Sequence, residues 1–128
     1  MATTKFKNNV RITGNLQVDG TTSSADAGSS QTLTASGAVA ATTKNLALNH
    51  ATVAIAATMV ATQHPGLFTV TDTSASGTAA HTVTLTGGTW NGTATVATLN
   101  APAESLVVFF DTAGNGTIVV NTGAVALS

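Results

Sequence analysis

The chain of 128 residues contains no cysteine and no tyrosine, and only 7% of its residues are charged. Without cysteine it has no disulfide framework, no thiolate nucleophile and no cysteine-based metal site. Soluble domains usually carry about 25% charged residues. A surface this poor in charge, on a chain of net charge −1, favours association with other proteins. We therefore expect further copies of the chain or a partner protein to cover much of its surface.

Basic residues are too few to form a nucleic-acid-binding patch. Phosphate recognition needs clustered Lys and Arg, and the chain has only Lys5, Lys7, Arg11 and Lys44. Its most apolar run, residues 51–61, is well short of the roughly 20 residues that cross a bilayer. The N-terminus has no apolar stretch of the kind found in secretory signals. We expect no nucleic-acid partner, no membrane partner and synthesis in the cytoplasm.

The segment "VRITGNLQVDG", residues 10–20, has the alternation of a half-buried strand. Val10, Ile12, Leu16 and Val18 share one face, whereas Arg11 lies on the polar face. Residues 21–45 are mostly Thr, Ser, Ala and Gly, a composition typical of a linker, and a short strand around residues 31–37 is an alternative because threonine alternates with Leu33 there. The sequence therefore predicts an extended N-terminal arm over residues 1–45, whose first strand pairs outside its own domain, with a neighbouring subunit or another protein.

Residues 46–128 are richer in strand patterns and are expected to form the body. Alternation with a period of two appears at residues 66–72 and 80–88, and Asn91-Gly92 is a strong signal for a tight hairpin turn. Residues 106–110, "LVVFF", are continuously apolar, so this strand is expected to be buried on both faces. A bend is expected near Asn49-His50. Seven or eight strands separated by turns every 8–12 residues predict an all-β body, an antiparallel β-sandwich or jelly roll.

The sequence contains no recognisable catalytic or cofactor motif. His50, His64 and His81 lack the spacing of a metal site and are interpreted as ordinary strand and turn residues, although one His repeated around a threefold axis remains an alternative. No Gly-x-Ser-x-Gly turn is present to position a serine nucleophile. The loop at Asp111 lacks the alternating carboxylates of a calcium loop. We expect no enzyme activity, cofactor or metal.

Two further alternatives remain open, and the first comes from rows of threonines on one strand face, such as "TVTLT". Flat arrays of threonine serve as ice-binding surfaces in some proteins, but such arrays recur at a fixed coil length, and here the spacing is uneven. The motif at residues 10–20 also suggests a β-helical filament of the bactofilin type, yet it occurs only once.

Several segments of the sequence resemble segments of bacteriophage virion proteins. These are "NVRITGNLQVDGTT", "LALNHATVAIAAT", "GTAAHTVTLTGGTWNGTATVATLNAPAESLVVFFD" and "GNGTIVVNTGAVALS". The resemblance covers most of the chain and implies a capsid decoration (cement) protein, a trimer seated on the major capsid protein of an HK97-type shell. It implies location on the outer capsid surface of the virion after assembly in the host cytoplasm. In this interpretation Val10, Arg11, Ile12, Leu16 and Val18 contact the capsid or a neighbouring subunit.

A tail-fibre or receptor-binding virion protein that recognises a glycan is the alternative. Trp90, beside the Asn91-Gly92 turn, would then be the residue that stacks on a sugar if it lies exposed at the loop tip. Against this alternative, the chain has neither the repeats nor the coiled coil that a long fibre requires.

Overall fold

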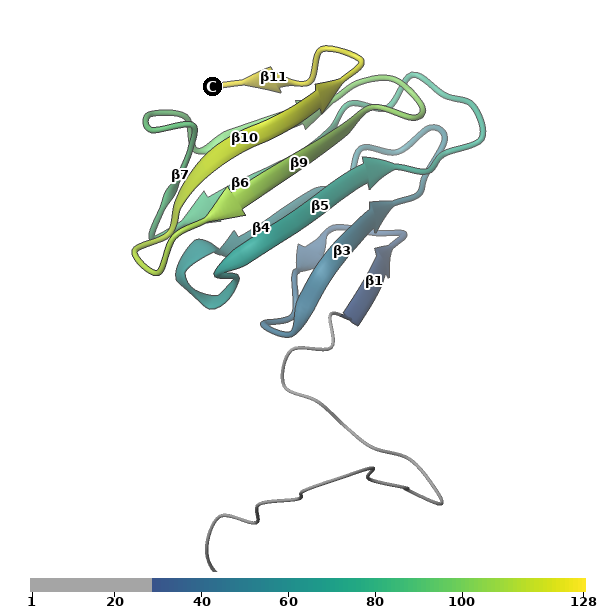
Figure 1. Ribbon diagram of the computed structural model, residues 1–128. Helices are drawn as coiled ribbons and strands as arrows, with labels where there is room; N and C mark the ends of the chain where they lie inside the picture. The colour runs from purple at the N-terminus through teal and green to yellow at the C-terminus, as the bar shows by residue number, and fades with distance from the viewer. Residues whose placement is uncertain (1–28) are drawn as a thin grey trace, which may run out of the picture.

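The computed structural model describes residues 29–128, which form two β-sheets packed face to face (Figure 1). The six-stranded sheet has the order β1-β3-β5-β9-β10-β7, and the five-stranded sheet has the order β11-β8-β6-β4-β2. The strands are β1 (Ser29–Leu33), β2 (Gly37–Ala38), β3 (Thr43–Leu48), β4 (Ala56–Val60), β5 (Gly66–Asp72), β6 (His81–Thr86), β7 (Thr89–Trp90), β8 (Val96–Leu99), β9 (Ser105–Phe110), β10 (Asn115–Thr122) and β11 (Ala126–Leu127). Within residues 29–128 the only helical element is a single 3-10 turn, Ala61–Gln63, and no helix is long and apolar enough to span a membrane.

The first six strands form parallel coils. The chain alternates between the sheets, so that β1, β3 and β5 pair in parallel in one sheet and β2, β4 and β6 pair in parallel in the other. The remaining strands pair mainly antiparallel, including the β9–β10 hairpin. The all-β prediction is confirmed, but the fully antiparallel prediction is wrong for the N-terminal half, which is stacked like a short solenoid.

The predicted boundary between arm and body at residue 45 is also wrong. β1, β2 and the first half of β3 lie before it, and Val39 is buried in the core. These residues looked like a linker because the first coil places few apolar side chains inside, chiefly Leu33 and Val39. Residues 1–28 lie outside the described part of the chain.

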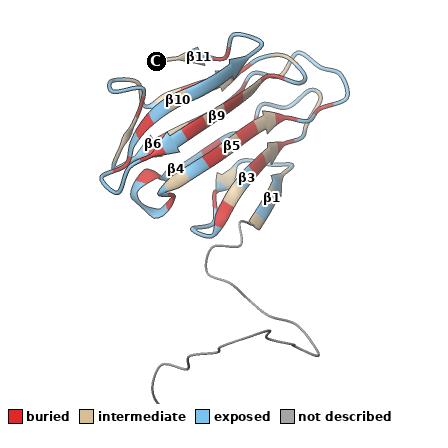
Figure 2. Cartoon of the chain, viewed as in Figure 1, coloured by how far each residue is buried: buried red, intermediate tan, exposed pale blue. Residues whose placement is uncertain are grey.

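One apolar core fills the space between the sheets. Figure 2 shows buried residues alternating with intermediate or exposed ones along β5 and β9, as expected when one face of each strand points inward. Phe68, Phe110 and Trp90 are fully buried, and their rings pack in series with centroid separations of 6.2 and 5.5 Å. These large side chains compensate for the many small Thr and Ala residues elsewhere.

The predicted turn at Asn91-Gly92 is confirmed. Asn91 and Gly92 have φ values of 50° and 97°, the left-handed conformations that a type I′ turn requires. The hairpin is short, however, because only Trp90 and Ala94 bridge across it. The expected break at Asn49-His50 is where the chain leaves β3 and crosses to the other sheet.

Candidate interaction surface

The outer face of the six-stranded sheet is formed mainly by uncharged side chains, and Lys44 on β3 is the one basic residue of this sheet. This face is formed by the side chains that alternate with the buried ones on β1, β3, β5, β9 and β10. The residues whose alternation with buried neighbours places them on this outer face include Ser30, Thr32, Asn45, Ala47, Leu67, Thr69, Thr71, Ser105, Val107, Phe109, Thr117, Val120 and Thr122. Strand pairing aligns them in rows, one of which runs Thr32, Ala47, Thr71, Ser105 and Thr122. The side chains in these rows are uncharged.

An apolar patch lies across three adjacent strands of this outer face. Leu67 on β5 is paired with Phe109 on β9, and Val107 on β9 is paired with Val120 on β10. Leu67 is 59% exposed, Phe109 49% and Val120 47%. Contiguous exposed apolar side chains of this kind are typical of interaction sites for proteins, membranes or ligands. We call these four residues the apolar patch.

The exposure of Phe109 corrects the prediction that residues 106–110 are buried on both faces. Leu106, Val108 and Phe110 point into the core, whereas Phe109 lies on the outer face with no described element covering it. The continuous apolar run thus combines a core face with a second apolar face.

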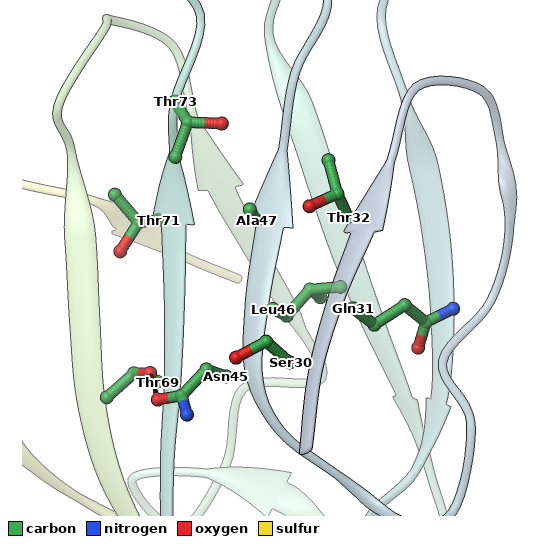
Figure 3. Close-up of a pocket in the computed structure, with 9 residues that line it drawn as sticks. All are labelled: Ser30, Gln31, Thr32, Asn45, Leu46, Ala47, Thr69, Thr71 and Thr73. Atoms are coloured by element: carbon green, nitrogen blue, oxygen red, sulfur yellow. Dashed lines mark hydrogen bonds between the residues drawn. The ribbon is translucent and has the colours of Figure 1, made fainter.

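A groove of about 310 Å³ continues this outer face over β1, β3 and β5. Figure 3 shows Ala47 between Thr32 and Thr71, with Ser30, Asn45 and Thr69 below them. The groove exists because alanine lies between two threonines on the neighbouring strands. Its lining presents hydroxyl, amide and methyl groups and neither a charge nor an aromatic ring. The alternation of inward and outward residues could be found in the sequence for β5. The residues that line the groove come together only through the parallel register of β1, β3 and β5.

Charge is almost absent from the rest of the described surface as well. Of the four charged residues between 29 and 128, Asp72 and Glu104 are buried. Lys44 donates a 2.6 Å hydrogen bond to the carbonyl of Pro65. Asp111 accepts bonds from the Ala113 and Asn115 amides and from the Asn115 side chain. The side-chain and backbone bonds from Asn115 lower the pKa of Asp111, which lies in the loop that joins β9 to β10.

A buried Asp-His-Ser cluster lies where β3, β5 and β6 meet, but its geometry is not that of a catalytic triad. The Nδ1 atom of His81 accepts a 3.0 Å bond from the amide of Ile55, which places the proton of a neutral ring on Nε2. Nε2 lies 3.4 Å from the Ser74 hydroxyl and 3.8 Å from Asp72. A triad needs an unprotonated Nε2 facing the serine and Nδ1–H facing the carboxylate. The cluster therefore holds the crossover between sheets in place.

His64 is a second buried histidine. Its Nδ1–H donates a 2.9 Å bond to the Thr43 carbonyl, and its Nε2 is buried without a partner. Burial lowers the pKa of His64, the bond to Thr43 raises it and the positive charge of Lys44 lowers it, with burial dominating. Protonation would bury a charged Nε2–H with nothing to accept its hydrogen bond.

We expect this histidine to make the fold acid-sensitive. Because the pKa of His64 is lower in the folded chain, the unfolded chain binds more protons below about pH 6.5, the ordinary value. The free energy of unfolding should fall as pH drops from 6.5 towards the lowered pKa. Urea unfolding of the wild type and of His64→Gln across pH 4.5–8 measures this. The difference in the free energy of unfolding between the two proteins should be constant above pH 7 and change below it. A difference that stays constant over the whole pH range would contradict the assignment of the acid sensitivity to His64.

The structure gives the location of one further candidate residue, Trp90. Trp90 is fully buried and its Nε1–H points to the Val83 carbonyl at 3.4 Å, so the exposed ring that the glycan-stacking alternative requires is not present. The predicted capsid contacts Val10, Arg11, Ile12, Leu16 and Val18 lie outside the described residues. Between residues 29 and 128, no group of three or more His, Asp or Glu residues could hold a metal ion.

Comparison with known proteins gives no match to a protein family, to a curated protein or to a solved structure.

Proposed function

We propose that the chain is a capsid decoration (cement) protein that binds the major capsid protein of an HK97-type phage shell as a homotrimer. The observation that carries the proposal is the mainly uncharged outer face of the six-stranded sheet with its exposed apolar patch. The resemblance of the sequence to phage virion proteins supplies the identity of the partner. In this role the chain has no enzyme activity and bridges neighbouring capsid subunits.

The outer face is suited to close contact with another protein. Burial of uncharged groups avoids the large desolvation cost of burying charges, and burial of apolar area contributes about 25 cal/mol per Å². The threonine and serine hydroxyls beside the apolar patch can donate and accept hydrogen bonds at the rim of the contact. A durable contact of this kind suits a component that reinforces a shell.

The alternative, a receptor-binding tail protein, has less support. Its proposed stacking residue, Trp90, is buried, and the groove over Ala47 has no aromatic side chain in its lining. Sugar-binding sites commonly use such rings because the faces of sugars pack against them.

The copy number and position of the protein in purified virions test the proposal. We expect cryo-EM to place it on the outer shell at threefold positions, with gel densitometry giving a fixed ratio to the major capsid protein. A few copies confined to the tail would contradict the proposal and favour the receptor-binding alternative. Absence from virions would also overturn it and return attention to the filament and ice-binding alternatives.

A further inference from the structure

The parallel coils of the described chain end at β1, which has a free edge. β1 is the outermost strand of the six-stranded sheet and pairs only with β3 (Figure 1). An unpaired edge presents backbone N–H and C=O groups to which another strand can bond. Leu33 points inward from β1 but is only partly buried, whereas its partner Leu48 on β3 is fully buried. The core is thus incompletely covered at this end.

The spacing of the first coil indicates where a preceding strand would fall in the sequence. Ser30 pairs with Asn45, and Leu33 pairs with Leu48, each fifteen positions later. A strand fifteen positions before β1 would place Asn15 beside Ser30 and Val18 beside Leu33. In that register Leu16 and Val18 point into the core, continuing the inward direction of Leu33.

The connecting length agrees with this register. Residues 34–42 carry the chain from β1 across the five-stranded sheet and back to β3. Residues 19–28 would make the equivalent passage from Val18 to Ser29 with one residue more. The same chain can therefore supply the additional strand, and no exchange of strands between copies is required.

We propose that the strand-forming segment of residues 10–18 occupies the free edge of β1 in the same chain, in parallel, with residues 15–18 paired to residues 30–33. It adds a fourth coil to the stack. Leu16 and Val18 cover the open end of the core, and Asn15 and Gln17 extend the outer face by one strand. These two apolar residues are then core residues, and not the capsid contacts that the sequence alone suggests.

Engineered disulfides test the register directly, because the natural chain contains no cysteine. Neighbouring strands lie about 4.8 Å apart, within the range that a disulfide spans. Asn15→Cys with Ser30→Cys is expected to form an intramolecular disulfide under mild oxidation, seen as a faster-migrating monomer on a non-reducing gel. Asn15→Cys with Thr98→Cys is the control, because Thr98 lies on the outer side of the five-stranded sheet. Equal cross-linking in both variants would overturn the proposal, and a covalent dimer through Ser30→Cys would show that a second copy supplies the strand.

A pair of charge variants in the full chain provides a second test. Leu16→Asp with Val18→Asp should lower the Tm by about 5 °C or more, because two carboxylates would face the core. Asn15→Asp with Gln17→Asp adds the same charge on the outer side and should change the Tm much less. Equal Tm values for the two variants would overturn the inward placement of Leu16 and Val18.

Discussion

Replacement of Leu67 and Phe109 by aspartate is expected to weaken binding to the capsid by about a hundredfold or more without unfolding the protein. The wild-type side chains are 59% and 49% exposed, so the fold does not depend on their burial. About half of each side chain remains to be buried against the partner, so in the proposed complex each contributes about half of the roughly 1.5–3 kcal/mol that full burial of such a side chain gives. The variant loses this contribution and must also desolvate two carboxylates, and each 1.4 kcal/mol corresponds to a tenfold change in Kd.

A matched variant separates a specific interface from a general effect of charge. Thr58 and Thr84 are paired neighbours on the outer side of the five-stranded sheet, as Leu67 and Phe109 are on the six-stranded sheet. Thr58→Asp with Thr84→Asp therefore adds the same charge and also places two carboxylates on neighbouring strands. Co-sedimentation with shells that lack the protein measures binding, and thermal melting by circular dichroism confirms folding. Equal loss of binding in both variants would contradict the assignment of the contact to the apolar patch.

The strands of the body could be predicted from the sequence because their signals are local. Alternation at residues 66–72 identified β5, and the Asn91-Gly92 turn was located correctly. In both cases the conformation follows from neighbouring residues alone: β-branched side chains favour extended backbone, and Asn-Gly tolerates the positive φ values of the turn.

The pairing of the strands could not be predicted, because it depends on contacts between distant residues. The short strand β1 contains Ser, Gln and Thr, which taken alone indicate a polar linker. It becomes a strand because Ser30 to Leu33 pair with Asn45 to Leu48, and this parallel pairing brings residues of different coils together. The same register creates the groove over Ala47.

The apolar patch was missed for a different physical reason. A strand with apolar side chains on both faces is normally covered on both sides, and the run at residues 106–110 follows that pattern. In the single chain only one side of β9 meets the opposite sheet, so Phe109 remains in solvent. The apolar run at residues 106–110 therefore does indicate a strand with two apolar faces. Under the proposed function the second covering layer comes from another protein.

Replacement of Trp90 by alanine is expected to give the largest loss of stability among single changes in the body, about 3–5 kcal/mol. The ring is fully buried and packs on Phe110 at a centroid distance of 5.5 Å, so its removal leaves a cavity between the sheets. That loss is comparable to the whole stability of a marginal domain, about 5–15 kcal/mol, so part of the population should unfold at moderate temperature. Urea denaturation followed by circular dichroism measures the change.

Trp90→Phe is the comparison variant for Trp90→Ala. It keeps an aromatic ring against Phe110 but loses volume and the Nε1–H bond to the Val83 carbonyl, which at 3.4 Å is a long one. We expect a cost well below that of alanine, since much of the packing contact survives. If instead alanine and phenylalanine both left stability unchanged, the indole would have to be exposed in solution, and its availability to stack on a glycan would be restored. A graded loss of stability from tryptophan through phenylalanine to alanine would place Trp90 in the core. Its ring would then be unable to stack on the glycan of a receptor.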